Sequence, residues 1–291
     1  MYQKNYLHCS LRMTLNMFLT GNNWNDLIDV MNIEMLKVVE WLRVNKLSLN
    51  LKKTHFVLFR KSNGKIHLDN DLIIDNVKID QTSQTKFLGV IIDEQLSFKQ
   101  HIRCIKGKVS RGLGILHKCK RFLNHNSLMQ LYNSFIYPYL NYCICVWGSA
   151  CQTYLQPLIT LQKKIIRLIF GAPKDEHTDP IFKKLGVLKI EEIYVYSLQF
   201  ILFKFHHQLL PDVFSNFFTI NSSIHDYPTR QANLMHVPIK KTKQASKTVR
   251  KNGVRSYNHF YNVIDMDCSI PCYKRQVKTH ILNNGVSFMN S

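Results

Sequence analysis

Acidic residues are scarce in this chain of 291 residues, which has 19 Asp and Glu against 39 Lys and Arg and a formal net charge of +20. Such an imbalance causes self-repulsion in the compact state and attracts polyanions, so nucleic acid is the leading class of partner. The basic residues are spread along the chain instead of forming one tail. This distribution favours a broad phosphate-binding face over a short targeting signal.

Long apolar runs are also missing. The richest one, residues 135–146, is interrupted by Pro138 and Asn141 and is too short to span a bilayer, and residues 1–11 lack the apolar core of a secretory signal. We therefore expect no membrane partner, and we expect the eight cysteines to be reduced thiols. The length and the hydrophobic content of 45% predict a packed core and about two domains.

Residues 24–59 combine two apolar periods. Three- and four-residue steps predict a helix that begins near Trp24, and its apolar face carries Leu27, Val30, Met31, Leu36, Val39 and Leu42. Asn45 and Asn50 then favour caps and turns, and the aromatic and branched residues 55–59 are typical of a strand. Lys53 is therefore expected where a helix and turn enter a sheet.

The chain contains the segments WL..NKLSLN..KT, which ends at Lys53-Thr54, and, further on, TKFLGVIID..LSF..HI. Together they resemble the reverse transcriptases of non-LTR retrotransposons, the jockey-like RNA-directed DNA polymerases. Within the first segment, Asn50-x-x-Lys53-Thr54 is similar to the fourth polymerase motif. The resemblance implies that Lys53 lies near the departing pyrophosphate, where a cation offsets phosphate charge or donates a proton. The alternative for Lys53 alone is a solvated lysine in a turn.

The second segment, TKFLGVIID..LSF..HI, contains Lys86–Val90, which resembles the fifth motif, the primer-gripping hairpin that closes the palm. The resemblance implies that Phe87, Leu88 and Gly89 approach the primer end. By composition, residues 87–92 are expected to form a buried strand in which Gly89 permits close backbone approach.

The catalytic carboxylates of this family are not matched. Residues 16–21 resemble the segment after the aromatic-Ala-Asp-Asp-Thr motif, which aligns the catalytic pair with Met13 and Thr14. The intact family is expected to use Mg²⁺ held by oxygen ligands, and a thioether and a hydroxyl do not replace them. The family's other metal-binding aspartate would lie before Met1. Asp26 and Asp29 are better explained by the dipole of the first helix, so we expect no catalytic residue, metal site or cofactor here.

Residues 98–123 return to a helical period. Ile102, Ile105, Val109, Leu113 and Leu116 form an apolar stripe, and the other positions carry Lys99, Arg103, Lys106, Lys108, Arg111, Lys118, Lys120 and Arg121. A charged helix usually marks only solvation. By the resemblance this segment lies where the polymerase thumb would be, and contact with a duplex backbone is the other interpretation. Its three glycines indicate either a kink or close packing.

The segment from Leu128 to Trp147 is rich in aromatic residues and resembles the region that follows the thumb. Core packing is favoured for these rings, and stacking of bases on them is the alternative. Residues 154–170 are expected to form an amphipathic helix that stops at Gly171, and residues 190–207 another that ends before Pro211. His206 and His207 are expected to pack or face solvent.

The C-terminal quarter contains a basic connection and a partial metal motif. Residues 226–250 lack an acid after Asp226 and are expected to form a mobile loop that binds nucleic acid through Lys240, Lys241 and Lys243. Cys268-x3-Cys272-x7-His280 partly resembles a zinc knuckle, but the fourth ligand position falls at Gly285. A final helix over residues 273–282 is preferred.

The sequence thus predicts an α+β fold with a mostly helical second part. Residues 1–97 are expected to be a palm remnant with its primer-grip hairpin, 98–125 a thumb-like basic helix, 126–225 a helical region, and 226–291 the basic loop and terminal helices. Three hypotheses remain open. The chain is a module that binds RNA or DNA through the duplex backbone, an enzyme that needs association with a missing polymerase half, or an inert decayed reading frame.

Overall fold

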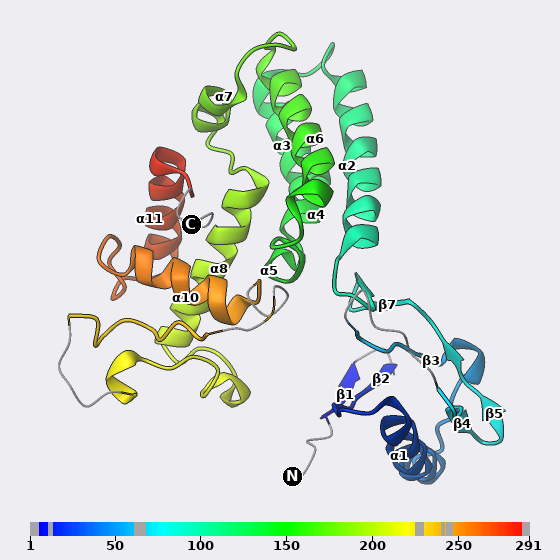
Figure 1. The fold of residues 1–291 in the computed structure, drawn as a ribbon. Helices are drawn as coiled ribbons and strands as arrows, with labels where there is room; N and C mark the ends of the chain where they lie inside the picture. Colours follow the sequence, from blue (N-terminus) through cyan, green and yellow to red (C-terminus); the bar gives the residue numbers. More distant parts are fainter. Residues whose placement is uncertain are drawn as a thin grey trace. The chain divides into compact units, whose positions relative to one another are not determined.

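The computed structural model describes residues 6–10, 14–60, 68–224, 230–239, 242 and 247–286. The chain divides into two compact units, Met1–Leu96 and Ser97–Ser291 (Figure 1). The first unit combines one long helix with short strands, and the regular elements described in the second are helices. The predicted α+β fold with a mostly helical second part is therefore confirmed. Within the described ranges, no helix is both long and apolar enough to cross a membrane.

Helix α1, Trp24–Val44, begins where the sequence predicts, and the side chain of Asn23 caps it by accepting from the Asn25 N–H. Its buried face packs with three residues from the later strands and their flanks, and together they form the core of the first unit: Ile28, Met35, Val38, Val39, Leu72, Ile74 and Ile79. The prediction that Leu36 belongs to this face is wrong, since it is 71% exposed. Leu36 follows the buried Met35, and adjacent helical positions point about 100° apart.

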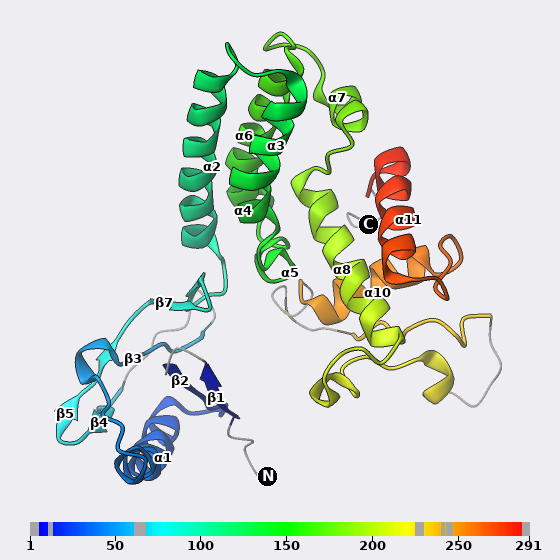
Figure 2. The same ribbon diagram turned by 180° about the vertical axis from the view of Figure 1, so that it is seen from behind.

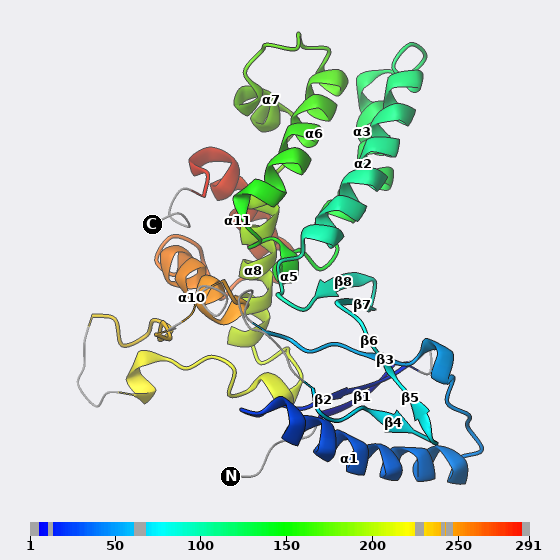
Figure 3. The same cartoon turned by 45° about the vertical axis from the view of Figure 1, so that its right-hand side comes forward.

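The strands of the first unit form four two-stranded sheets (Figure 3). Three are antiparallel and one is parallel; the pairs are β1 (Tyr6–Ser10) with β2 (Thr14–Phe18), β4 (Ile73–Ile74) with β5 (Val77–Lys78), β7 (Gln84–Phe87) with β8 (Val90–Asp93), and, in parallel, β3 (His55–Phe56) with β6 (Asp80–Gln81). The strand expected over residues 55–59 is only two residues long.

The single buried strand predicted for residues 87–92 is wrong, because the chain reverses inside it. Phe87 pairs with Val90, and Leu88 and Gly89 between them have φ values of 44° and 84°. Two consecutive positive φ values are what a tight two-residue hairpin turn requires. The hairpin implied by the resemblance is therefore present, and it presents Leu88, which is 54% exposed, at its tip.

The second unit is built from helices α2 to α11. Their bounds are α2 Lys99–Cys119, α3 His125–Phe135, α4 Tyr137–Asn141, α5 Ile144–Trp147, α6 Gln152–Phe170, α7 Thr178–Leu185, α8 Ile190–His206, α10 Val249–Phe260 and α11 Ile270–Asn284, with short 3₁₀ helices at Asp212–Phe214 and Asn221–Ser223. Helix α6 stops at Gly171 (φ 81°), as predicted, and α11 contains the predicted final helix. Figures 1 and 2 both show α2 beside α3, α4 and α6.

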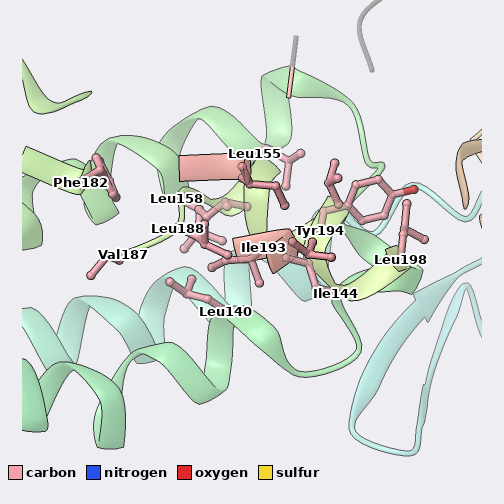
Figure 4. Close-up of a cluster of buried hydrophobic side chains, with 14 of the residues drawn as sticks. Leu140, Ile144, Leu155, Leu158, Phe182, Val187, Leu188, Ile193, Tyr194 and Leu198 are labelled. Carbon is pink, nitrogen blue, oxygen red and sulfur yellow. The ribbon is translucent and has the colours of Figure 1, made fainter. Parts of the chain in front are cut away.

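One core joins these helices. Figure 4 shows side chains from α4, α5, α6, α7 and α8 meeting in it, among them Leu140, Ile144, Leu158, Phe182 and Ile193. Two buried amides lie within the same core. Gln162 of α6 donates to the Tyr132 hydroxyl (3.2 Å) and the Leu188 carbonyl (3.0 Å) and accepts from the Ile190 N–H (3.2 Å). Because every polar atom of this amide has a partner, its burial fixes the order of the helices around it.

The second buried amide, Gln199 of α8, joins the two C-terminal helices to the same core. It donates to the Ser256 hydroxyl of α10 (2.6 Å) and accepts from the Tyr273 hydroxyl of α11 (2.8 Å). The ring of Tyr273 stacks on Phe203, with centroids 4.2 Å apart. Helices distant in sequence are therefore held by specific polar contacts as well as by apolar packing.

Helix α2 is continuous, and its apolar stripe is turned inward as predicted, with Leu113 half-buried and the other four residues buried. Its glycines differ in their surroundings. A Cβ atom added at Gly112 would lie 2.7 Å from Cγ1 of the fully buried Ile136, whereas one added at Gly107 or Gly114 would meet nothing within 4 Å. The glycine at 112 therefore serves close packing of α2 on the end of α3.

The three glycines should respond oppositely to alanine. G107A and G114A are each expected to raise the free energy of unfolding by about 0.5–1 kcal/mol, because alanine loses less backbone entropy in a helix. G112A is expected to lower it by about 1–3 kcal/mol, because Ile136 has no free space to move into. Urea unfolding followed by circular dichroism measures all three, and equal gains would contradict the assigned packing.

Candidate nucleic-acid interface

Lys53 lies at the end of a short 3₁₀ turn, Leu51–Lys53 (η1), and its side chain is exposed. The carbonyl of Asn50 holds this turn by accepting from the N–H groups of Lys53 (3.0 Å) and Thr54 (3.1 Å) and from the Thr54 hydroxyl (3.0 Å). The Thr54 hydroxyl is thus a side-chain group of the motif that helps to hold the turn, and the Lys53 cation points to solvent.

The turn and the hairpin of β7 and β8 are joined by one contact. A ring nitrogen of His55, directly after the turn, lies 2.7 Å from the Thr85 hydroxyl on β7. The Phe87 ring packs edge-on against Phe18 of β2, with centroids 6.3 Å apart. Lys53 and the Phe87–Gly89 hairpin thus belong to one unit. Sequence inspection missed His55, which reads as an ordinary strand residue.

The positions aligned with the catalytic pair, and the two aspartates at the start of α1, have the following surroundings. Met13 lies outside the described residues, and Thr14 opens β2. The Asp26 carboxylate accepts from the Asn23 amide (3.0 Å), and Asp29 accepts from the Asn70 amide (2.8 Å), so both act as structural acceptors. Across the described part of the chain, no three His, Cys, Asp or Glu side chains converge as metal ligands.

In the second unit, the cations of α2 lie outside its buried stripe. We call the exposed set Lys99, Arg103, Lys106, Arg111 and Lys118 the basic face of α2. Lys108 is half-buried, and its ammonium lies 5.0 Å from the Tyr139 ring centroid. Among the described residues, no cation of α2 pairs with a carboxylate.

The surroundings of the basic face explain why its charges are uncompensated. Residues 95–174, which form α2 to α6, contain no Asp or Glu. The same stretch holds Lys99, Arg103, Lys106, Lys108, Arg111, Lys118, Lys120, Arg121, Lys163, Lys164, Arg167 and Lys174. The positive potential of α2 is therefore reinforced by its neighbours, as in a surface that attracts phosphates.

The basic connection that precedes α10 is described only in part. Lys240, Lys241 and Lys243 lie outside the described residues, and Arg250 belongs to α10, where its guanidinium lies over the Phe217 ring at 5.5 Å. Their role in binding stays a prediction.

The two cysteines and the histidine of the partial zinc motif have different neighbours. The Gln276 amide contacts the sulfurs of Cys272 (3.3 Å) and Cys268 (3.8 Å). The His280 ring instead packs against Phe260, with centroids 5.1 Å apart. His280 therefore does not complete a site with the two thiols, and Gly285 ends α11 instead of providing a ligand.

His101, on the buried side of α2, is kept neutral by its position. Its ring lies edge-on to the buried Trp147, with centroids 5.8 Å apart. Burial lowers the pKa of His101 from 6.5 to about 4, and the nearby charge of Lys108 acts in the same direction. If His101 were protonated, it would add a positive charge to the buried side of a helix that is already basic.

Comparison with known proteins gives relatives of one kind. The chain is 28% identical over 136 residues to a probable RNA-directed DNA polymerase from transposon X-element of Drosophila melanogaster, covering 45% of this chain and 14% of the relative. It is 28% identical over 174 residues to the RNA-directed DNA polymerase from mobile element jockey of Drosophila funebris, covering 58% of this chain and 18% of that relative. The jockey polymerase of Drosophila melanogaster is 32% identical over 109 residues, covering 36% and 12%.

The chain is therefore related to the RNA-directed DNA polymerases of transposons. More narrowly, its relatives include the jockey elements, as the two sequence motifs imply. The matched regions span less than a fifth of the length of these curated relatives. No family model and no solved structure matches the chain.

Acid should weaken the fold through His101. Below pH 6.5 the unfolded chain binds a proton there that the folded chain excludes until about pH 4. Stability is therefore lost as the pH falls through this window, by about 2 kcal/mol between pH 7 and pH 5. In H101L the free energy of unfolding, measured with urea at pH 7 and pH 5, should no longer show this part of the loss. The control H117Q, at an exposed histidine of α2, should keep it. An unchanged pH dependence in H101L would contradict the assignment.

Proposed function

We propose that the chain binds the backbone of RNA or DNA duplexes with little sequence preference, using the basic face of α2. The observation that carries this proposal is a set of exposed cations on a helical assembly whose residues 95–174 contain no acid, and the described residues provide no carboxylate partner for them. Phosphate contacts by lysine and arginine supply affinity without reading sequence. The relatives are RNA-directed DNA polymerases, which supports a nucleic-acid substrate.

We further propose that the chain alone does not carry out nucleotide transfer. The positions aligned with the catalytic pair hold Met13 and Thr14, and two-metal catalysis requires carboxylate oxygens to hold both ions. Lys53 and the Phe87–Gly89 hairpin would then contribute to binding only.

A second candidate function is to complete a polymerase together with a separate polymerase half. Helix α1 favours it, because Ile33, Leu36 and Val44, which lie outside its buried face, are 57%, 71% and 72% exposed. Such a partner would cover apolar surface that water now contacts.

Neutralising the basic face should weaken binding and its salt dependence. In the variant R103Q/K106Q/R111Q, we expect lower affinity for a labelled duplex, measured by fluorescence anisotropy over a series of salt concentrations. Each lost phosphate contact should reduce the slope of log K against log salt by about 0.9 on DNA.

The matched control is K183Q/K184Q/K278Q, which removes the same charge from exposed lysines on α7 and α11. Its affinity and slope should change less. Equal effects of the two triple variants would show that only the net charge of the chain matters for binding. Absence of binding by the unmodified protein near physiological salt would refute the proposal.

Purified protein is expected to extend no primer on an RNA template with Mg²⁺ or Mn²⁺, because the aligned catalytic positions lack carboxylates. Extension of a labelled primer resolved on a denaturing gel measures this. Nucleotide incorporation that copurifies with the chain and survives a control for contaminating polymerase would show that other residues hold the ions.

A further inference from the structure

Three aromatic side chains of the segment expected to form core are exposed. Phe135, Tyr139 and Tyr142 are 49%, 39% and 53% exposed, whereas Tyr132 and Trp147 of the same segment are fully buried. We call these three the aromatic row. Phe135 is the last residue of α3, Tyr139 lies in α4, and Tyr142 directly follows α4. The sequence period alone does not separate these outward rings from the inward ones.

The aromatic row borders α2. The ammonium of Lys108 lies 5.0 Å from the Tyr139 ring centroid. Four residues further along α2, Gly112 packs against Ile136, next to Phe135. The two contacts place Phe135 and Tyr139 beside α2, and Figures 1 and 2 show α2 beside α3 and α4.

At Lys108 the row adjoins the basic face of α2. Lys108 touches the row, and Arg111, one helical turn further along, belongs to the basic face. No acid from residues 95–174 lies between them, because that stretch has none. Exposed rings therefore lie beside cations that have no carboxylate partner among the described residues.

This combination fits one class of ligand better than its alternatives. Duplex phosphates are bound by cations and need no exposed rings. Protein interfaces are depleted of lysine relative to the rest of the surface. Unpaired bases stack on aromatic side chains whatever their sequence, while adjacent cations bind the phosphates of the strand.

We infer that the aromatic row is a stacking platform for unpaired bases of single-stranded RNA or DNA, whose phosphates follow Lys108 and Arg111. The inference rests on the proposed nucleic-acid binding and deepens it. It gives the chain two adjoining modes of contact, one for the duplex backbone on the basic face and one for unpaired bases on the row. A junction between single and double strands would engage both.

The test compares two triple variants that differ only in whether they keep the rings. F135L/Y139L/Y142L replaces each ring by an apolar side chain, and F135Y/Y139F/Y142F keeps all three. Affinity is measured by anisotropy for a labelled oligothymidine of about 20 nucleotides and for a duplex of the same length. Thermal unfolding of both variants verifies the fold.

The leucine variant is expected to lose about tenfold or more in affinity for the single strand, as removal of at least one stacking contact requires, and less than about twofold for the duplex. The ring-preserving variant should bind both as the unmodified protein does. Unchanged single-strand affinity in the leucine variant, with duplex binding intact, would overturn the inference and leave the proposed function standing. Absence of binding to either probe would overturn both.

A second copy of the chain is the competing occupant of the row. Light scattering after size exclusion measures the mass of the unmodified protein and of the leucine variant. A dimer that becomes a monomer on ring removal, with single-strand affinity unchanged, would assign the row to self-association and refute base stacking.

Discussion

The burial of one apolar stripe on α2 must overcome the mutual repulsion of the cations around it. Residues 95–174 have no carboxylate to offset those charges, so the helix is held by packing. Each fully buried Ile, Val or Leu contributes about 1.5–3 kcal/mol, and Ile102, Ile105, Val109 and Leu116 are all buried. A pair of exposed charges costs far less in water and is screened by salt. The basic face can therefore remain uncompensated without unfolding the unit.

Specific polar contacts then fix which helices lie beside this one. Gln162 joins α6 to α3 and to the start of α8, and Gln199 joins α8 to α10 and α11. An unpaired buried amide is costly, so rearranged helices that leave either side chain without partners are disfavoured. The position of the aromatic row beside α2 thus depends on contacts in the core as well as on Gly112. The binding surface is a consequence of the packing beneath it.

Regular periods made much of the fold predictable. The stripe of α2, the Gly171 stop of α6 and the start of α1 follow from local sequence, because caps and helical spacing act over a few residues. Leu36 and the 87–92 run were predicted wrongly for identifiable reasons. Apolar character does not show which side of α1 is covered, and it does not reveal that Leu88 adopts a positive φ. For the candidate site, the cations of α2 were predictable from the sequence. The His55–Thr85 contact was not, because it joins residues 30 apart that only the folded chain brings together.

Descent and retained function have separate physical signatures in this chain. Relation to a polymerase is carried by motifs such as Asn50-x-x-Lys53-Thr54, whose turn is held by its own backbone and would persist without catalysis. Packing requirements account for the buried stripe of α2, but they do not require that its exposed side, or residues 95–174 as a whole, lack acids. Interspersed acids would reduce repulsion and stabilise the unit. Their absence favours a polyanion as the missing counter-charge, so the basic face is stronger support for binding than the motifs are.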